Sequence, residues 1–112
     1  MTGTAPELVL VILNVAPGIE DAVVDWLLGR AGQKGFTSTT VYGHSSRHDG
    51  LSAAEQVRGR RRRMQFEIHM ARDAVQDFVS EAHAEFGAAD VHCLVLPAIA
   101  AGSLATVLES GI

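Results

Sequence analysis

The chain has 112 residues, of which 47% are hydrophobic and 20% charged, with one cysteine and a net charge of −4. The length predicts one domain, and the lone cysteine excludes a disulfide scaffold and favours a reducing compartment. The acidic balance argues against a nucleic-acid binder. The longest apolar run, residues 8–13, is too short to span a bilayer, and no basic region follows Met1, so we expect a soluble cytoplasmic protein.

The first half of the chain predicts a strand, a helix and a second strand. Residues 1–6 are expected to be a disordered lead, whereas residues 8–13 are apolar at every position, which is typical of a strand covered on both faces. Pro17 predicts the first turn of a helix that continues to Leu28 and ends at Gly29. Residues 35–42 are rich in β-branched side chains and predict the second strand.

The second half predicts a loop, a strand, a helix and a last strand. Residues 43–59 hold glycine, serine, histidine and aspartate without a strand period, so we expect a long mobile loop. Residues 63–70 alternate between apolar and polar, a helix follows from Asp73 to Gly87, and residues 91–96 form a strand that ends at Pro97. The C-terminal extension, residues 98–112, is expected to add a short edge strand or to cross to a neighbouring molecule.

The order of these elements predicts an α+β fold of the ferredoxin-like βαββαβ type. Two helices would cover one face of a four-stranded antiparallel sheet and leave the other face bare. Because the first strand is apolar on both sides, a second copy of the chain is the simplest cover for that bare face. We therefore expect a homo-oligomer.

Several local strings resemble one known family. Residues 35–43, Gly-Phe-Thr-Ser-Thr-Thr-Val-Tyr-Gly, resemble the second strand of PII signalling proteins; residues 63–79 and 91–104 resemble that family's third strand and second helix, and its last strand and extension. The strings at 24–28, 48–52 and 54–57 are similar to those of a PII-like group of unknown function that is often encoded beside heavy-metal efflux pumps. The resemblance implies a homotrimer that binds a ligand at clefts between subunits and signals through the loop at 43–59.

The candidate ligand-binding residues come from this resemblance and from charge. The resemblance implies a role in the cleft for Gly35, Thr37 and Gly43. Residues 58–63 carry five arginines, whose guanidinium groups suit phosphate or carboxylate. For a nucleotide or other anion we expect contacts from the cleft positions and from His44, Arg47, Arg58, Arg60 and Arg61. The alternative for the arginines is a solvated hairpin base or a surface for an acidic partner.

One segment departs from the PII pattern. PII proteins hold nucleotide phosphates with a glycine- and lysine-rich loop before the last strand. Residues 86–90 of this chain contain one glycine, no lysine and an added carboxylate, Asp90. This difference argues against binding of ATP or ADP in the usual mode.

A second set of candidate residues could bind a metal. His44 and His92 are expected at one edge of the layer, with His48 in the loop above, and they could converge across a subunit interface on zinc, copper or nickel, with Asp49 or Asp90 completing the site. The alternative is that these histidines are scattered on the surface. Cys93 is expected to be a small core residue.

The sequence thus leaves three functions open. The first is a PII-like trimeric sensor with a small ligand, such as an adenine nucleotide, another anion or a divalent metal, and a membrane efflux transporter as partner. The second is a divalent-metal-binding tolerance protein of the CutA kind. The third is a small cofactor-free ferredoxin-like enzyme with a closed apolar pocket. No catalytic motif is present, and the resemblance to PII proteins implies binding and signalling rather than turnover, so we expect no enzymatic activity while keeping the small enzyme as an alternative.

Overall fold

The computed structural model of the protein describes residues 7–30, 35–44 and 60–112. Along the chain the elements are β1 (Leu8–Val15), the 3-10 turn η1 (Pro17–Ile19), α1 (Glu20–Leu28), β2 (Thr37–His44), β3 (Arg60–Ala71), the 3-10 turn η2 (Arg72–Ala74), α3 (Val75–Phe86), β4 (Val91–Ala98) and α4 (Leu104–Glu109).

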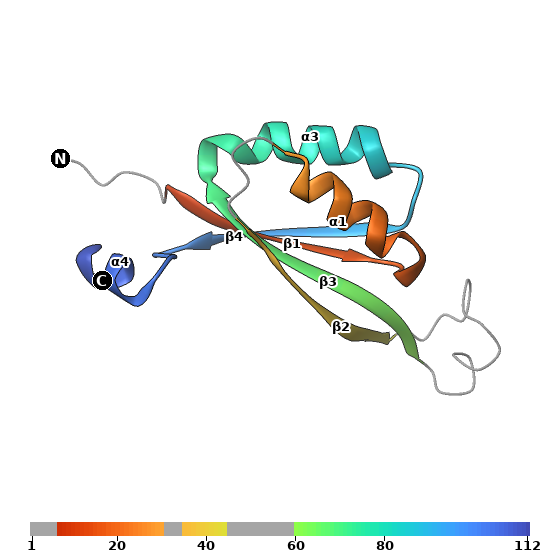
Figure 1. The fold of residues 1–112 in the computed structure, drawn as a ribbon, viewed down its shortest axis with the longest axis horizontal. Coiled ribbons are helices and arrows are strands. Elements are labelled where there is room, and N and C mark those ends of the chain that lie inside the picture. Colours follow the sequence, from red (N-terminus) through yellow and green to blue (C-terminus); the bar gives the residue numbers. More distant parts are fainter. Residues whose placement is uncertain (1–6, 31–34, 45–59) are drawn as a thin grey trace.

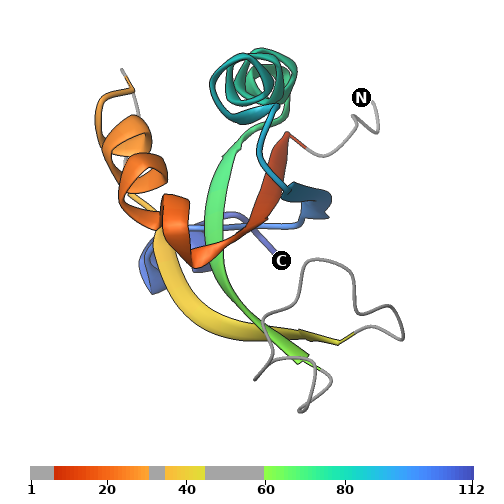
Figure 2. The same ribbon diagram turned by 90° about the vertical axis from the view of Figure 1, so that its right-hand side faces the viewer.

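The four strands form one antiparallel sheet in the order β2-β3-β1-β4. Helices α1 and α3 lie on the same face of this sheet, as both views show (Figures 1 and 2). This arrangement confirms the predicted α+β, ferredoxin-like fold. The first strand is central, because it pairs with β3 on one side and with β4 on the other.

The core lies between the sheet and the two long helices. Alternate residues of β1 point into it, and so do alternate residues of β3, because side chains of a strand alternate between the faces of a sheet. Helix α1 adds Val23 and Leu27, and α3 adds Phe78. Trp26 packs at the rim against Phe78 and Phe86, with ring centroids 5.3 and 5.6 Å apart. The buried apolar residues are Val9, Val11, Leu13, Val15, Val23, Leu27, Met64, Phe66, Ile68 and Phe78.

The face of the sheet opposite these helices bears an apolar strip. It consists of Leu8, Leu10 and Ile12 of β1, which are half-buried, and their pairing partners on β4, of which Leu94 is 45% exposed and Leu96 39% exposed. The prediction of a sheet with one bare face is therefore confirmed for the single chain.

Two segments reach beyond this core at opposite ends of the molecule, an arm of β2 and β3 and the helix α4 (Figure 1). Strand β1 ends at Val15, opposite Met64, but β2 and β3 continue as a two-stranded arm, residues 41–44 paired with 60–63. Positions 43 and 44 thus belong to a strand and not to the expected loop, whose remaining positions, 45–59, lie outside the described residues.

Of the two alternatives predicted for the C-terminal extension, the short edge strand is wrong, whereas a crossing to a neighbouring molecule stays a prediction. Strand β4 continues through Pro97, opposite Val9, to Ala98, and the chain then forms the short helix α4. Ser103 caps this helix by accepting a hydrogen bond from the backbone N–H of Thr106. Leu104 and Leu108 of α4 are almost fully exposed.

Gly87 ends α3 at a position where a side chain does not fit. A Cβ there would lie 2.4 Å from the carbonyl oxygen of His83, whereas a Cβ at Gly18 would have no neighbour within 4 Å. We expect Gly87→Ala to lower the free energy of unfolding by about 1–3 kcal/mol, measured by urea denaturation at fixed protein concentration. Gly18→Ala is the control, and equal stability of the two variants would contradict the expectation.

Candidate functional site

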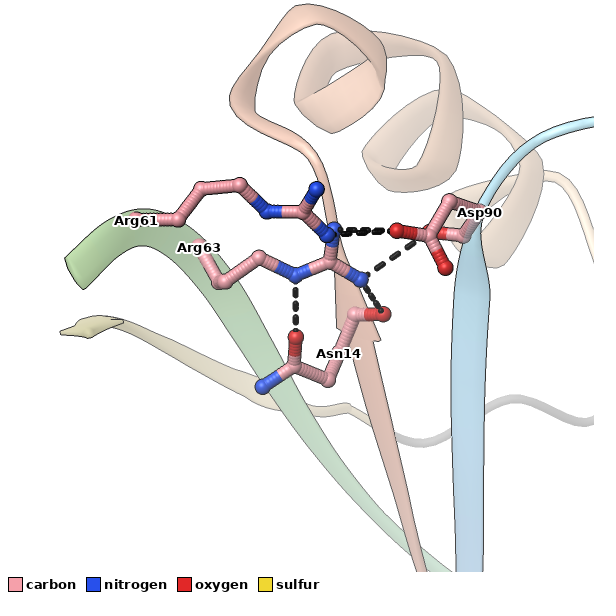
Figure 3. A network of polar contacts seen from close by, with 4 residues as sticks. All are labelled: Asn14, Arg61, Arg63 and Asp90. Atoms are coloured by element: carbon pink, nitrogen blue, oxygen red, sulfur yellow. Dashed lines mark hydrogen bonds and ion pairs between the residues drawn. The ribbon is translucent and has the colours of Figure 1, made fainter. Parts of the chain in front are cut away.

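A buried arginine occupies the base of the arm. Arg63 comes directly before Met64, the first residue of β3 that pairs with β1, and it is 5% exposed although it lies on the face opposite the helices. The polar residues beside it are Asn14, at the end of β1, and Asp90, directly before β4 (Figure 3). One guanidinium group therefore joins the ends of three neighbouring strands.

The hydrogen bonds of Arg63 explain how its charge is tolerated there. Its Nε donates to Asn14 Oδ1 at 2.5 Å, and its Nη2 donates to the carbonyl oxygens of Asn14 and Asp90 at 2.9 and 3.0 Å. Its Nη1 donates to Asp90 Oδ2 at 3.0 Å. A buried cation without such partners would be strongly destabilising. The four hydrogen bonds compensate for the burial of the charge, and they also hold the guanidinium in one orientation.

Arg61 approaches the same carboxylate from the arm. It lies two residues before Arg63, and its Nη2 donates to Asp90 Oδ2 at 2.5 Å. The Asp90 side chain is 65% exposed. The hydrogen bond from Arg61, together with the charge of Arg63, outweighs the opposing effect of burial and holds the pKa of Asp90 below its ordinary value. The carboxylate is thus ionised between two guanidinium groups.

The other arginines of the arm are not all on this face. Arg60 lies on the opposite side of the strand, and its guanidinium carbon is 4.2 Å from the centroid of the Tyr42 ring, which indicates a cation–π contact. His44 pairs with Arg60, and Gly43 pairs with Arg61. The predicted cluster of arginines is therefore divided between the two faces of the arm. Arg47 and Arg58 lie outside the described residues.

The remaining candidates for the ligand cleft lie farther away within one chain. Gly35 has a φ of 148°, a conformation that favours glycine, and precedes β2. Thr37 starts β2 opposite Glu67, whereas Gly43 lies near its end, about 20 Å away along an extended strand. A single chain does not bring these positions together, although neighbouring subunits of an oligomer could.

The candidate metal ligands are also apart in the single chain. His44 lies on the edge strand β2 and His92 on the opposite edge strand β4. Their side chains lie on opposite faces, because His92 shares the face of Asn14 and His44 the other. His48 is outside the described residues, and among the residues that are described no three His, Cys, Asp or Glu side chains form a cluster suited to a metal ion.

The structure also has a groove on the helix side of the sheet, where the enzyme hypothesis expected a closed apolar pocket. It lies between α3 and β4, has a volume of about 530 Å³ including space open to solvent, and is mostly apolar. Cys93 lines it and is exposed in the chain, so its prediction as a core residue was wrong. The position is on an edge strand whose helix-facing side α3 does not fully cover. Partial burial raises the pKa of the Cys93 thiol, which disfavours a reactive thiolate.

The described helices include none that is both long and apolar enough to cross a membrane.

The comparison with known families gives a match over most of the chain. The family described as protein of unknown function, DUF3240, matches residues 5–105. A crystal structure of a DUF3240 family protein from Shewanella baltica has a TM-score of 0.72 and 19% sequence identity, and covers 88% of this chain and 97% of that chain. No curated protein matches in sequence.

Other solved structures share the fold at low identity. A protein from Thermus thermophilus described as PII-like and signalling has a TM-score of 0.56 and 23% identity, covering 81% of this chain and 85% of that chain. CutA from Synechococcus elongatus, solved with a Bis-Tris molecule, has a TM-score of 0.60 and 18% identity, covering 95% of each chain. These likenesses establish a PII-like and CutA-like fold.

Conservative variants of the two arginines test their unequal roles in the fold. We expect Arg63→Lys to lower the free energy of unfolding by about 2 kcal/mol, because one ammonium group cannot replace four guanidinium hydrogen bonds. Arg61→Lys should cost less than about 1 kcal/mol, since its ion pair with Asp90 is solvent-exposed. Urea denaturation measures both, and similar losses would contradict this assignment.

Proposed function

The chain belongs to the DUF3240 family, and from this premise we propose that it is a PII-like regulatory protein. In this proposal three copies form a homotrimer that binds a small ligand at the clefts between subunits. In the proposal, the segment that connects β2 to β3 transmits the signal of ligand binding to a partner protein. The proposal is one of binding and signalling rather than enzymatic turnover, and it places the protein in the cytoplasm.

The observation that carries this proposal is the apolar strip opposite the helices. Central and edge strands of a sheet rarely leave a row of leucine and isoleucine side chains in water unless another molecule covers them. The leucines of α4, Leu104 and Leu108, are also exposed, so the C-terminal part of the chain adds further uncovered apolar side chains. A second copy provides a matching apolar surface, and the number three follows from the resemblance to PII proteins.

The ligand would bind along the arm. Arg60 and Arg61 place positive charge on both faces there, next to a strand pair that passes into the segment at 45–59. We assign the ligand contacts to Gly35, Thr37, Gly43, His44, Arg47, Arg58, Arg60 and Arg61, with the more distant positions supplied by neighbouring subunits. Nucleotides, other anions and divalent metals all remain ligands within this proposal.

The partner in this proposal is a membrane efflux transporter for heavy metals. It rests on the resemblance of short sequence strings to a PII-like group encoded beside such pumps. A ligand that binds two states of the segment at 45–59 with different affinity would shift their populations and so control contact with the partner.

A CutA-like metal-binding protein is the second candidate. The fold of CutA supports it, and so do the exposed His44 and His92 on the two edge strands, which different subunits could bring together around one metal ion at His44, His48 and His92. The third hypothesis, an enzyme, required a closed apolar pocket; the groove beside Cys93 is open to solvent and does not favour it.

The assembly is tested by a charge on the apolar strip. We expect the wild-type protein to be a trimer at micromolar concentration, and Leu94→Glu to give smaller species, because a carboxylate would be buried without a partner. Leu28→Glu is the control, since Leu28 is exposed on α1 and away from the strip. Native mass spectrometry reports the number of subunits. A monomeric wild-type protein in dilute solution would overturn the proposed trimer.

Ligand binding is tested by a panel of adenine nucleotides, bicarbonate, zinc and copper. A ligand at 100 times its Kd should stabilise the protein by about 2.7 kcal/mol, and in the PII-like proposal it should also slow hydrogen exchange in peptides from 45–59. If the protein is a CutA-like metal binder, we expect the double variant His44→Ala/His92→Ala to lose tight binding of zinc or copper. The control variant His69→Ala should retain that binding. Metal binding that survives the double variant would contradict the histidine site.

A further inference from the structure

The ion pairs at the base of the arm have the form of an occupied anion site. Nη2 of Arg61 and Nη1 of Arg63 both donate to one oxygen, Oδ2 of Asp90, at 2.5 and 3.0 Å (Figure 3). Two guanidinium groups that converge on a single oxygen form the kind of site that binds phosphate, because each supplies a charge-assisted hydrogen bond.

The two arginines differ in how firmly they are held, and both properties suit a binding site. Arg63 is buried and bound on its other edge to Asn14, so its free edge is already oriented before a ligand arrives. Arg61 is partly exposed, and its only hydrogen bond within the described part of the chain is the one to Asp90. Among the described residues its other N–H groups have no acceptor, and in the proposed site they would donate to an incoming oxyanion.

The side chain of Asp90 can move away from Arg61 and Arg63 while the backbone of Asp90 keeps its position. The carbonyl oxygen of Asp90 accepts a hydrogen bond from Arg63 independently of the carboxylate. The side chain is 65% exposed, so rotation about its χ angles moves the carboxylate into water without opening the core.

We propose that Asp90 is an internal competitor at an anion site made by Arg61 and Arg63. In the free protein its carboxylate occupies the guanidinium groups, and a phosphate group of a small ligand replaces it on binding. This inference rests on the proposed function, because it names the ligand class of the same region. It also adds a role for Asp90, which sets the ligand concentration at which the site becomes occupied.

The physical basis is a competition between two anions of different charge. A carboxylate carries one negative charge, whereas a phosphate group carries up to two and has more acceptor oxygens, so it can engage both guanidinium groups at once. Asp90 would repel the phosphate if it remained in place. Each molecule of ligand must therefore displace the carboxylate, and this lowers the apparent affinity of the site.

The experiment measures anion binding to Asp90→Asn by isothermal titration calorimetry. The probes are inorganic phosphate, pyrophosphate and ATP at constant ionic strength, and the protein is the full chain in its purified oligomeric form. Asparagine keeps the size of the side chain and an oxygen that can accept from Arg63, and circular dichroism checks the fold. We expect Asp90→Asn to bind at least one probe about fivefold or more tightly than wild type, the factor that corresponds to a weak ion pair.

Two further variants make the result specific. Glu81→Gln removes a carboxylate of similar exposure, 58%, that pairs with Arg30 at 2.7 Å on the helical layer, and it should bind the probes like wild type. Arg61→Ala combined with Asp90→Asn should lose the gain. ATP binding that is much tighter than pyrophosphate binding identifies a nucleotide as the source of the phosphate, and equal binding identifies the phosphate group alone.

The contrary outcomes separate this inference from the proposed function. Equal affinity of wild type and Asp90→Asn for every probe that binds would overturn the role of Asp90 but leave ligand binding intact. An equal gain in Glu81→Gln would reduce the effect to overall charge and also overturn it. If no variant binds any probe, the anion site is refuted, whereas the proposed trimer and its response to metals stand or fall on the separate measurements above.

Discussion

The guanidinium group of Arg63 is the interaction on which the architecture of this protein depends. It connects the end of β1, the start of the arm on β3 and the residue before β4 in one set of hydrogen bonds. Ordinary strand pairing ends near this point, because β1 stops at Val15 while β2 and β3 continue. Without Arg63, the connection of the arm toward β4 among the described residues would be the exposed ion pair of Arg61 with Asp90. The guanidinium group of Arg63 thus holds the three strands together and is also part of the proposed anion-binding site.

The second constraint is that the sheet is covered on one side only. Helices α1 and α3 complete a core on one face, and the leucines and isoleucine of the other face remain in contact with water in the single chain. Because β1 is central, both of its faces must be apolar if the second face is also to be covered in an assembly. Assembly and ligand binding would then be linked, since the clefts between subunits would border the same arm that Arg63 anchors.

The sequence allowed the fold to be predicted because each main element has a strong local pattern. The unbroken apolar run of β1, the alternation from Met64 to Met70 and the glycine that ends each long helix identify the order of elements. The site was less predictable. Arg63 is one of several arginines in a run, and only the nearness of Asn14 and Asp90 in space distinguishes it from the others. Two features of the sequence pointed to this site: Asn14 is a polar residue near the end of an apolar strand, and Asp90 is a carboxylate directly before the last strand. Helix α4 was not predicted because a segment of six residues is too short for its hydrophobic periodicity to distinguish a helix from a strand.

Pro97 on the edge strand β4 has a consequence for how copies of this chain meet. An exposed strand edge can extend a sheet from molecule to molecule without limit, and such growth ends in fibres. Proline has no backbone N–H, so an approaching strand finds a gap in the row of donors along this edge. This edge of the sheet therefore resists open-ended growth by strand addition, and in the proposed oligomer contact between copies would fall to the apolar strip instead.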